Sequence, residues 1–254
     1  MNKLILKITI LFCAVILMSF CFPPKKIKVY LIGDSTIAIK QKSTYPETGW
    51  GMPFANFFDA EVEVDNRALN GRSTKSFLAE NHWQPVVDSL KQGDYVFIQF
   101  GHNDEGKEKV GRYTTVDEFK INLVKYVTET RSKKGIPVLV TPVSRRKFDA
   151  AGKAIETHLL YTEAAKEVAK AQNVPLIDLD QKSIELYQKF GAENSKLLFM
   201  QLEPGVNPNY PDGRIDNTHF NELGAREIAQ LVLKEIRTLN LDLVNHIVKP
   251  VVKK

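Results

Sequence analysis

The chain has 254 residues, of which 43% are hydrophobic and 26% are charged. This composition excludes disordered and collagen-like proteins and provides enough apolar material for a sizeable core. Lys and Arg together number 35 against 30 Asp and Glu, and the net charge of +5 is too small to indicate nucleic acid as a partner.

The first residues have the pattern of an export signal. Lys3 and Lys7 provide a positive start, and an apolar run of about 15 residues follows at 8–22, shorter than the roughly 20 residues of a bilayer span. We therefore expect a signal peptide at residues 1–22 and a single domain at 23–254. The domain should be periplasmic or extracellular and without membrane attachment once the leader is removed; an uncleaved anchor is the alternative.

The cysteines also lie in this leader. Small residues at Ser19 and Cys21 favour cleavage after Cys21, and Phe20 fits poorly before a cysteine that carries a lipid. We therefore favour cleavage over a lipoprotein anchor at Cys21. Because Cys13 and Cys21 are the two cysteines of the chain, the mature domain has no thiol nucleophile, thiolate zinc site or internal disulfide.

Short β-branched and apolar runs alternate with helical patterns along the rest of the chain. We predict strands at Lys28 to Ile32, Val62 to Asn66, Tyr95 to Phe100, Pro137 to Thr141 and Val174 to Leu179. Several are almost continuously apolar, which is typical of parallel strands covered by helices on both faces. The pattern predicts an α/β protein, a three-layer α/β/α sandwich with a mainly five-stranded parallel sheet.

The helices between these strands have recognisable ends. Thr115 and Glu118 have the spacing of a capping box, and Gly135 stands where that helix should end. The last helix is predicted from Asn221 to Leu239. In a sheet of this kind the ligand crevice lies at the carboxyl ends of the strands, so catalytic residues should follow strands.

A serine follows the first predicted strand in the tight turn Gly33-Asp34-Ser35, which would present its hydroxyl at the top of the sheet. The surrounding residues do not spell the G-x-S-x-G elbow of the α/β-hydrolases, so a different serine hydrolase layout is left open. Taken alone, the triplet is equally an ordinary βα turn in which Ser35 caps a helix.

Two further turns follow neighbouring strands. Asn103 comes after the third strand, and its side-chain amide can donate to an oxyanion; an Asx turn is the alternative. Gly71 comes after the second strand, where its backbone N–H can be a second donor or the glycine can serve a plain turn. Both positions belong to the rim that should carry Ser35.

An Asp and a His stand three residues apart near the C-terminus. Asp216 and His219 end a loop rich in Pro, Gly and Asn, just before the last helix. Asp216 can hold one imidazole nitrogen while the other takes the proton of Ser35. A lone histidine more often satisfies a local hydrogen bond, so the assignment depends on the whole set.

Together these blocks resemble those of the SGNH, or GDSL, hydrolases, and the resemblance covers nearly the whole mature chain. It implies a flavodoxin-like fold with Ser35 as nucleophile, Asp216 and His219 as the rest of the triad, and Ser35, Gly71 and Asn103 as the oxyanion hole. The resemblance also implies that no metal or other cofactor is used. Asp34 and Asp104 with His102 are candidate metal ligands by residue type, but no separate ligand cluster supports a metal site.

Within the family, several strings are similar to the rhamnogalacturonan acetylesterase branch. Thr36 departs from the Leu of the GDSL name, as it does in that branch. The similar strings are Gly33-Asp34-Ser35-Thr36, Tyr45-Pro46-Glu47-Thr48-Gly49-Trp50-Gly51, Gly71-Arg72-Ser73, Phe100-Gly101-His102-Asn103-Asp104, Thr141-Pro142-Val143 and Thr218-His219-Phe220. The resemblance implies removal of acetyl groups from the rhamnose and galacturonate backbone of pectin.

An acidic polysaccharide calls for positive charge and stacking surfaces near Ser35. The predicted substrate-binding residues are Arg72, Arg145, Arg146, His102, Trp50 and Trp83. Each arginine is otherwise a solvated surface charge, each tryptophan a core residue, and the histidine a structural support.

The expected partner is thus an acetylated acidic polysaccharide or oligosaccharide, not nucleic acid or membrane. The alternatives are an esterase of another acetylated glycan such as xylan or of other short acyl esters, and a non-catalytic glycan-binding protein. The complete set of Ser35, Asp216 and His219 argues against the last. A lipase is not favoured because no exposed apolar lid segment follows the leader.

Overall fold

The computed structural model describes residues 26–249, so the predicted signal peptide lies outside the described residues. Five parallel strands form one sheet in the order β2-β1-β3-β4-β5. The strands are β1 (Ile27–Gly33), β2 (Val62–Asn66), β3 (Tyr95–Gln99), β4 (Ile136–Val140) and β5 (Leu176–Ile177). This is the flavodoxin-like order, and the predicted fold class is confirmed.

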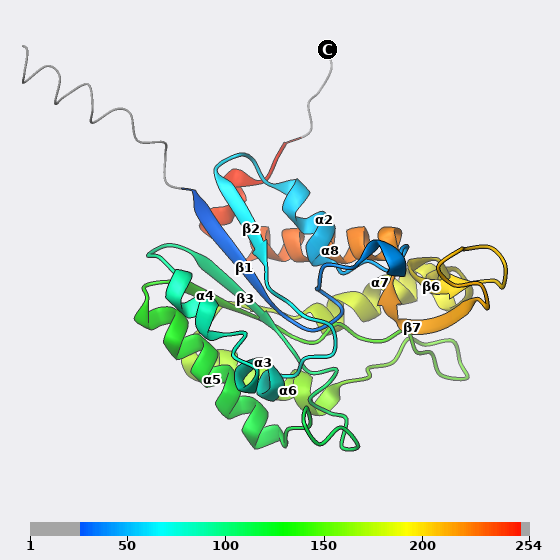
Figure 1. Cartoon of the computed structure of the whole chain (residues 1–254), viewed down its shortest axis with the longest axis horizontal. Helices are drawn as coiled ribbons and strands as arrows, with labels where there is room; N and C mark the ends of the chain where they lie inside the picture. Colours follow the sequence, from blue (N-terminus) through cyan, green and yellow to red (C-terminus); the bar gives the residue numbers. More distant parts are fainter. Residues whose placement is uncertain (1–25, 250–254) are drawn as a thin grey trace, which may run out of the picture.

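Helices cover both faces of the sheet (Figure 1). On one side lie α3 (Thr74–Ala79), α4 (Gln84–Ser89), α5 (Val116–Ser132) and α6 (Leu159–Gln172). On the other lie α2 (Gly51–Phe54), α7 (Leu179–Asn194) and α8 (Glu222–Thr238). Short 3-10 helices stand at η1 (Lys42–Thr44), η2 (Ala55–Phe57), η3 (Ser195–Leu198) and η4 (Asp242–His246).

The strand residues divide between two buried clusters because successive side chains of a strand point to opposite faces. In β1, Val29 and Leu31 pack into the cluster with α2, α7 and α8, whereas Tyr30 and Ile32 pack into the cluster with α3 to α6. All four are at most 1% exposed. The continuously apolar strands of the sequence are therefore buried on both sides, as predicted.

Two predicted element ends differ in detail. The fifth strand has only two ladder residues, since Pro175 lacks an N–H and Asp178 instead caps α7 by accepting from the Gln181 amide. The capping box of Thr115 and Glu118 at α5 is present. The left-handed residue after α5, however, is Lys134 with a φ of 59°, one position before the predicted glycine.

A two-stranded antiparallel hairpin, β6 (Phe199–Leu202) and β7 (Arg214–Phe220), precedes α8. The prediction that Asp216 and His219 end a loop is wrong, because both lie on β7. The β7 sequence has few apolar residues and no alternation, so only its pairing with β6 makes it a strand. A register irregularity opposite Phe199 and Met200 separates the Asp216 and Phe220 pairings.

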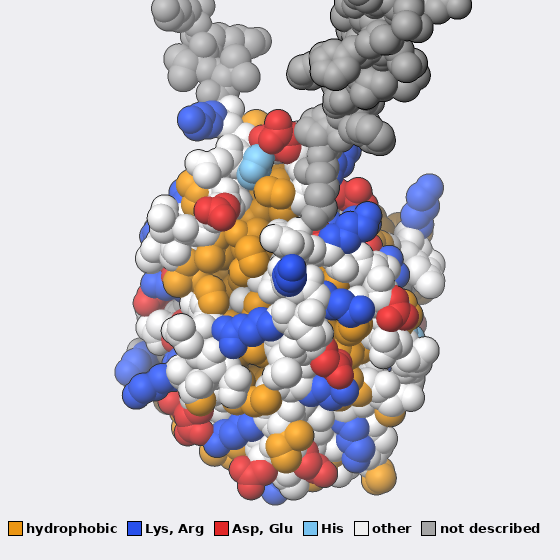
Figure 2. All heavy atoms as spheres, turned by 90° about the vertical axis from the view of Figure 1, so that its left-hand side faces the viewer, with side chains coloured by type: hydrophobic (Ala, Val, Ile, Leu, Met, Phe, Trp, Pro, Cys, Tyr) orange, Lys and Arg blue, Asp and Glu red, His pale blue; other side chains and the backbone are white. Residues whose placement is uncertain are grey.

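The surface in Figure 2 carries basic and acidic side chains interspersed with one another. No field of a single sign covers this face, in keeping with the small net charge. Within residues 26–249, no helix is long and apolar enough to cross a membrane.

Candidate active site

The residues predicted to form the catalytic site lie together at the carboxyl edge of the sheet. Ser35 follows β1, Gly71 follows β2, and Asn103 follows β3, so the chain turns into this edge from three adjacent strands. His219 on β7 joins them, and all four line one cavity of about 420 Å³. The edge lies where the strand order reverses around β1, the usual place for a ligand in an open α/β sheet.

Ser35, His219 and Asp216 form one hydrogen-bonded chain. The Ser35 Oγ lies 2.9 Å from His219 Nε2, and His219 Nδ1 lies 2.8 Å from Asp216 Oδ2. Because the carboxylate accepts the proton of Nδ1, the neutral imidazole is left with Nε2 as an acceptor for the serine hydroxyl. This arrangement can remove a proton from Ser35 as it attacks a carbonyl carbon.

Asp216 receives four hydrogen bonds. Its Oδ1 accepts the backbone amides of Thr218 at 2.7 Å and His219 at 3.0 Å, and its Oδ2 accepts from Arg214 Nη2 at 2.6 Å in addition to His219 Nδ1. Burial acts to raise the pKa of Asp216, but the bonds from His219 and Arg214 outweigh it and hold the pKa far below its ordinary value. The carboxylate therefore stays ionised while it orients the histidine.

Arg214 begins a line of alternating charges that sequence reasoning missed. Arg214 Nη1 lies 3.5 Å from Glu47 Oε2, and Glu47 Oε1 lies 2.8 Å from Lys40 Nζ. The lysine, whose side chain is only 2% exposed, donates to Asn70 Oδ1 at 2.6 Å, next to the candidate oxyanion glycine. The line thus joins Asp216 to the loop after β2, and burial lowers the pKa of Lys40.

The turn that carries Ser35 is held by a buried chain of hydrogen bonds. Thr36 Oγ1 donates to Asp34 Oδ1 at 2.8 Å and accepts from Gln99 Nε2 at 2.6 Å. Trp50 Nε1 in turn donates to Gln99 Oε1 at 2.9 Å. Thr36 therefore has a role that the usual Leu cannot fill. Trp50 is fully buried, so the prediction that it stacks on sugar rings is wrong.

The candidate oxyanion donors face the same cavity. Asn103 Nδ2 donates one of its hydrogens to the Arg72 carbonyl at 3.0 Å, which leaves its second hydrogen for a ligand. Among the described residues, the amides of Ser35 and Gly71 donate no hydrogen bond. Gly71 has a φ of +75° and Gly101, before Asn103, has a φ of +140°, and both values favour glycine.

Besides Trp50, three of the predicted substrate-binding residues lie outside this cavity. Trp83 is 2% exposed and donates from Nε1 to Glu129 in the core beneath α5. The Arg72 guanidinium pairs with Glu80 at 2.6 Å. The Arg146 guanidinium ties the end of α7 and η3 to β7. The reason is common to all three: each side chain has a structural partner that the strand-by-strand pattern could not reveal.

Arg145 does line the cavity, together with two cations that the sequence analysis missed. Arg145 Nη1 pairs with Glu105 at 2.6 Å. Arg112 and Lys109 reach the cavity from the loop between β3 and α5, and a Cβ at Gly71 would lie 3.0 Å from Arg112 Nη1. Nothing in the loop sequence indicates that it returns to the cavity. The three cations make the pocket suited to an anionic ligand.

His102 also lines the cavity, from a buried position. Its ring centroid lies 4.2 Å from that of His158, whose Nδ1 bonds to Glu105 Oε2 at 2.9 Å. Burial lowers the pKa of His102 well below its ordinary value, so this imidazole is neutral. Within the described part of the chain, no group of three His, Cys, Asp or Glu side chains is arranged to hold a metal ion.

The fold and this arrangement of residues are those of the SGNH class of hydrolases. Residues 31–227 match the GDSL-like Lipase/Acylhydrolase family, and the chain belongs to this family. It is therefore a carboxylic ester hydrolase.

Particular relatives are similar over most of their length. The chain is 43% identical over 224 residues to rhamnogalacturonan acetylesterase RhgT of Bacillus subtilis (strain 168), covering 88% of this chain and 95% of that protein. It is 29% identical over 227 residues to the rhamnogalacturonan acetylesterase of Emericella nidulans, covering 82% of this chain and 84% of that protein.

Solved structures share the fold. Bacillus subtilis protein YxiM matches with a TM-score of 0.75 at 24% identity, over 87% of this chain and 58% of that chain. A catalytic mutant of the acetylxylan esterase Axe2 from Geobacillus stearothermophilus matches with a TM-score of 0.58 at 19% identity, over 84% of this chain and 94% of that chain.

We expect Arg214→Met to lower kcat on a short aryl acetate by about tenfold or more, with little change in KM, because Asp216 loses a charge-assisted bond. Arg214→Lys should restore part of the loss. Steady-state kinetics test this beside Arg237→Met, which removes an exposed arginine at the far end of α8. An unchanged kcat would show that His219 and the backbone amides hold Asp216 without Arg214.

We expect a second effect in the pH dependence of stability. Burial raises the pKa of Asp104 to about 7, although Thr74 and Thr114 donate hydrogen bonds to it. An unfolded chain releases this proton near pH 4, so the free energy of unfolding should fall as the pH rises from about 4 to 7. The Asp104→Asn variant has no proton to lose at this position. Its free energy of unfolding, relative to that of the wild type, should therefore rise by about 1 to 3 kcal/mol between pH 5 and pH 8.

Urea unfolding of both proteins at the two pH values measures this gain. A difference between wild type and variant that is equal at pH 5 and pH 8 would mean that Asp104 is already ionised in the folded protein at pH 5.

Proposed function

We propose that the protein is an exported serine esterase that removes acetyl groups from the rhamnogalacturonan of pectin by way of an acetyl-enzyme on Ser35. The observation that carries the mechanism is the chain from Ser35 Oγ through His219 to Asp216, with links of 2.9 and 2.8 Å. The relatives named rhamnogalacturonan acetylesterase support the substrate. The leader pattern at residues 1–22 supports export.

In the first half of the reaction, Ser35 Oγ attacks the acetyl carbonyl carbon while its proton passes to His219 Nε2. Asp216 stabilises the imidazolium that forms. When the tetrahedral intermediate collapses, the bond between the carbonyl carbon and the sugar oxygen breaks. The sugar oxygen takes the proton from His219 and leaves as a hydroxyl, and the acetyl group remains on Ser35.

In the second half, water repeats the same steps. His219 takes a proton from the water as its oxygen attacks the acetyl-enzyme, and it returns a proton to Ser35 Oγ as acetate leaves. In both halves the negative oxygen is stabilised by the amides of Ser35 and Gly71 and by the Asn103 side chain. No other group needs to change its charge, because Asp216 stays ionised throughout.

The charge of the cavity supports an acidic glycan. Galacturonate places a carboxylate on alternate residues of the rhamnogalacturonan backbone. Arg112, Arg145 and Lys109 line the cavity, whereas the carboxylate of Glu47 in the same wall is already paired with Lys40 at 2.8 Å. A neutral glycan such as xylan would gain no charge-assisted bond from these cations, although the triad itself would accept its acetyl esters equally well.

We expect Asn103→Ala to lower kcat by about 10² to 10³ and to leave KM nearly unchanged, because the donated bond strengthens only as charge develops on the oxygen. Kinetics on a short aryl acetate measure both constants. The Asn103 amide also bonds to the Arg72 carbonyl, so circular dichroism should check that the loop and fold are intact. A rise in KM alone would assign Asn103 to ground-state binding.

We expect Arg112→Met to lower kcat/KM on acetylated rhamnogalacturonan by about tenfold, through loss of a charge-assisted bond, and to affect a short aryl acetate far less. Added salt should likewise lower the kcat/KM of the wild type on the polymer, because it screens charges beyond about 10 Å at 0.1 M. Arg237→Met is the matched control, since it removes one exposed positive charge outside the cavity.

Acetate release from acetylated rhamnogalacturonan and from acetylated xylan, measured with wild type, Arg112→Met and Arg237→Met, tests the substrate. Faster release from xylan, with no loss in Arg112→Met and no salt effect, would contradict the pectic assignment and favour a neutral acetylated glycan. Equal losses on polymer and aryl acetate would show that Arg112 supports the catalytic loop and not the glycan.

A further inference from the structure

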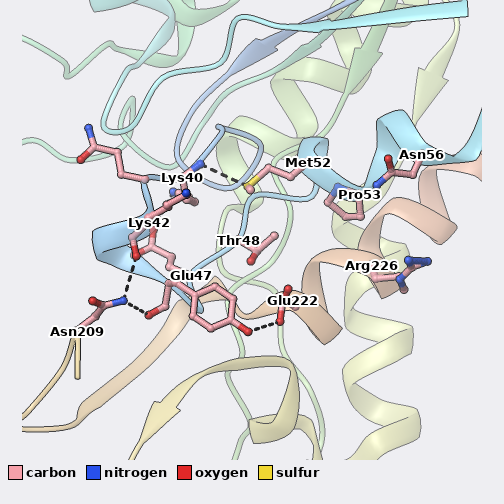
Figure 3. A pocket seen from close by; sticks show the side chains of 12 residues that line it. Lys40, Lys42, Glu47, Thr48, Met52, Pro53, Asn56, Asn209, Glu222 and Arg226 are labelled. Carbon is pink, nitrogen blue, oxygen red and sulfur yellow. Dashed lines mark hydrogen bonds and ion pairs between the residues drawn. The ribbon is translucent and has the colours of Figure 1, made fainter. Parts of the chain in front are cut away.

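A second pocket of about 550 Å³ lies beside the catalytic cavity, and Glu47 lines both. Its walls come from the segment around η1, from α2, from the first turn of α8 and from Asn209 (Figure 3). We propose that this pocket, here called the Tyr45 pocket, binds a distal galacturonate-bearing segment of the same glycan chain whose acetyl group reacts at Ser35. The inference rests on the proposed function, and it extends the binding site beyond the residues around the triad.

The wall between the two cavities is rigid. The carboxylate of Glu47 pairs with Lys40, whose side chain is 2% exposed, and with Arg214. One residue further along, the Thr48 amide donates to the Phe220 carbonyl at the end of β7 at 2.9 Å. The wall is thus bonded directly to the strand that carries His219, so a glycan seated in the Tyr45 pocket is held at a fixed place relative to the triad.

Tyr45 offers an aromatic ring to this pocket. It is 50% exposed and lines the pocket, so its ring is accessible to a ligand. Its hydroxyl donates to Glu222 Oε2 at 2.7 Å, in the first turn of α8. The bond fixes the ring and occupies the carboxylate, and a fixed exposed ring is a suitable platform for the apolar face of a pyranose.

Two cations flank the pocket. Figure 3 shows Lys42 and Arg226 on opposite sides of it, and neither forms an ion pair with another described residue. The guanidinium of Arg226 lies 5.4 Å from the centre of the Phe57 ring, which keeps it at the rim. Glu47 is neutralised by its ion pair with Lys40, and Glu222 keeps its charge because Tyr45 is a neutral donor. The two cations outnumber that one carboxylate, so the net charge offered to a ligand is positive.

This pattern matches the chemistry of the proposed substrate. In a backbone with a carboxylate on alternate sugars, two uronates are separated by one neutral sugar. Cations on two sides of an aromatic platform can take the two carboxylates while the neutral sugar lies on the ring. A neutral glycan would use the ring but gain nothing from Lys42 and Arg226.

Binding of unacetylated rhamnogalacturonan oligosaccharides of increasing length tests the inference. Calorimetric titrations use the Ser35→Ala protein as background, with Tyr45→Ala, Arg226→Gln or the control Arg237→Gln added. We expect affinity to rise about tenfold or more once the oligosaccharide spans both cavities. The rise should be lost with Tyr45→Ala and with Arg226→Gln, and kept with Arg237→Gln, which removes a charge from the same helix.

Unacetylated xylo-oligosaccharides of the same lengths form the neutral arm, and their affinity should not depend on Arg226. A rise with length that survives both substitutions would overturn the inference while wild-type acetate release from acetylated rhamnogalacturonan still supports the proposed function. If the wild type releases no acetate from that polymer, the proposed function fails, and the inference fails with it. Equal losses on xylo-oligosaccharides in Arg226→Gln would overturn the assignment of Arg226 to a uronate.

Discussion

A single carboxylate, that of Asp216, sets the geometry of the active site. It is largely withdrawn from water, with its side chain 15% exposed, and an ion in such a place must be compensated by hydrogen bonds and opposite charge. The compensation comes from the neighbouring backbone on β7, from Arg214 and from His219. The bonds that satisfy the charge of Asp216 therefore also fix the orientation of His219, the proposed base. Through Arg214, Glu47 and Lys40 they link His219 to the loop after β2.

The parallel sheet supplies the remaining part of the arrangement. The order β2-β1-β3 places three strand ends side by side, and each delivers one functional residue to the same rim. Behind that rim, the buried polar side chains of Trp50, Gln99 and Thr36 are linked by hydrogen bonds. This buried chain holds the turn that carries Ser35. Rigid elements on both sides of Ser35 thus keep its hydroxyl at hydrogen-bond distance from His219 without a substrate.

Sequence reasoning predicted what depends on local pattern and failed where distant pairings decide. The strands follow from apolar runs, and Ser35, Gly71 and Asn103 follow from their positions after those strands. The hairpin β6–β7 was not predicted, because Arg214 to Phe220 lacks the alternation of apolar residues typical of a strand. The position of Asp216 on a strand and its contact with Arg214 could therefore not be predicted either. The burial of Trp50 could not be predicted, because the sequence does not distinguish a core tryptophan from one that stacks on a sugar ring. Arg112 reaches the cavity through a loop whose path no local pattern encodes.

The central claim is that an acetyl group passes through Ser35, and rapid-quench mass spectrometry tests it most directly. With an activated aryl acetate, fast acylation makes hydrolysis of the acetyl-enzyme the slow step, so the intermediate should accumulate. The account predicts a burst of about one aryl alcohol per active site, with one acetyl group on the peptide that contains Ser35 and none in the Ser35→Ala protein. Turnover without a burst and with no acetyl on that peptide, or an acetyl group on another residue of the cavity, would contradict it.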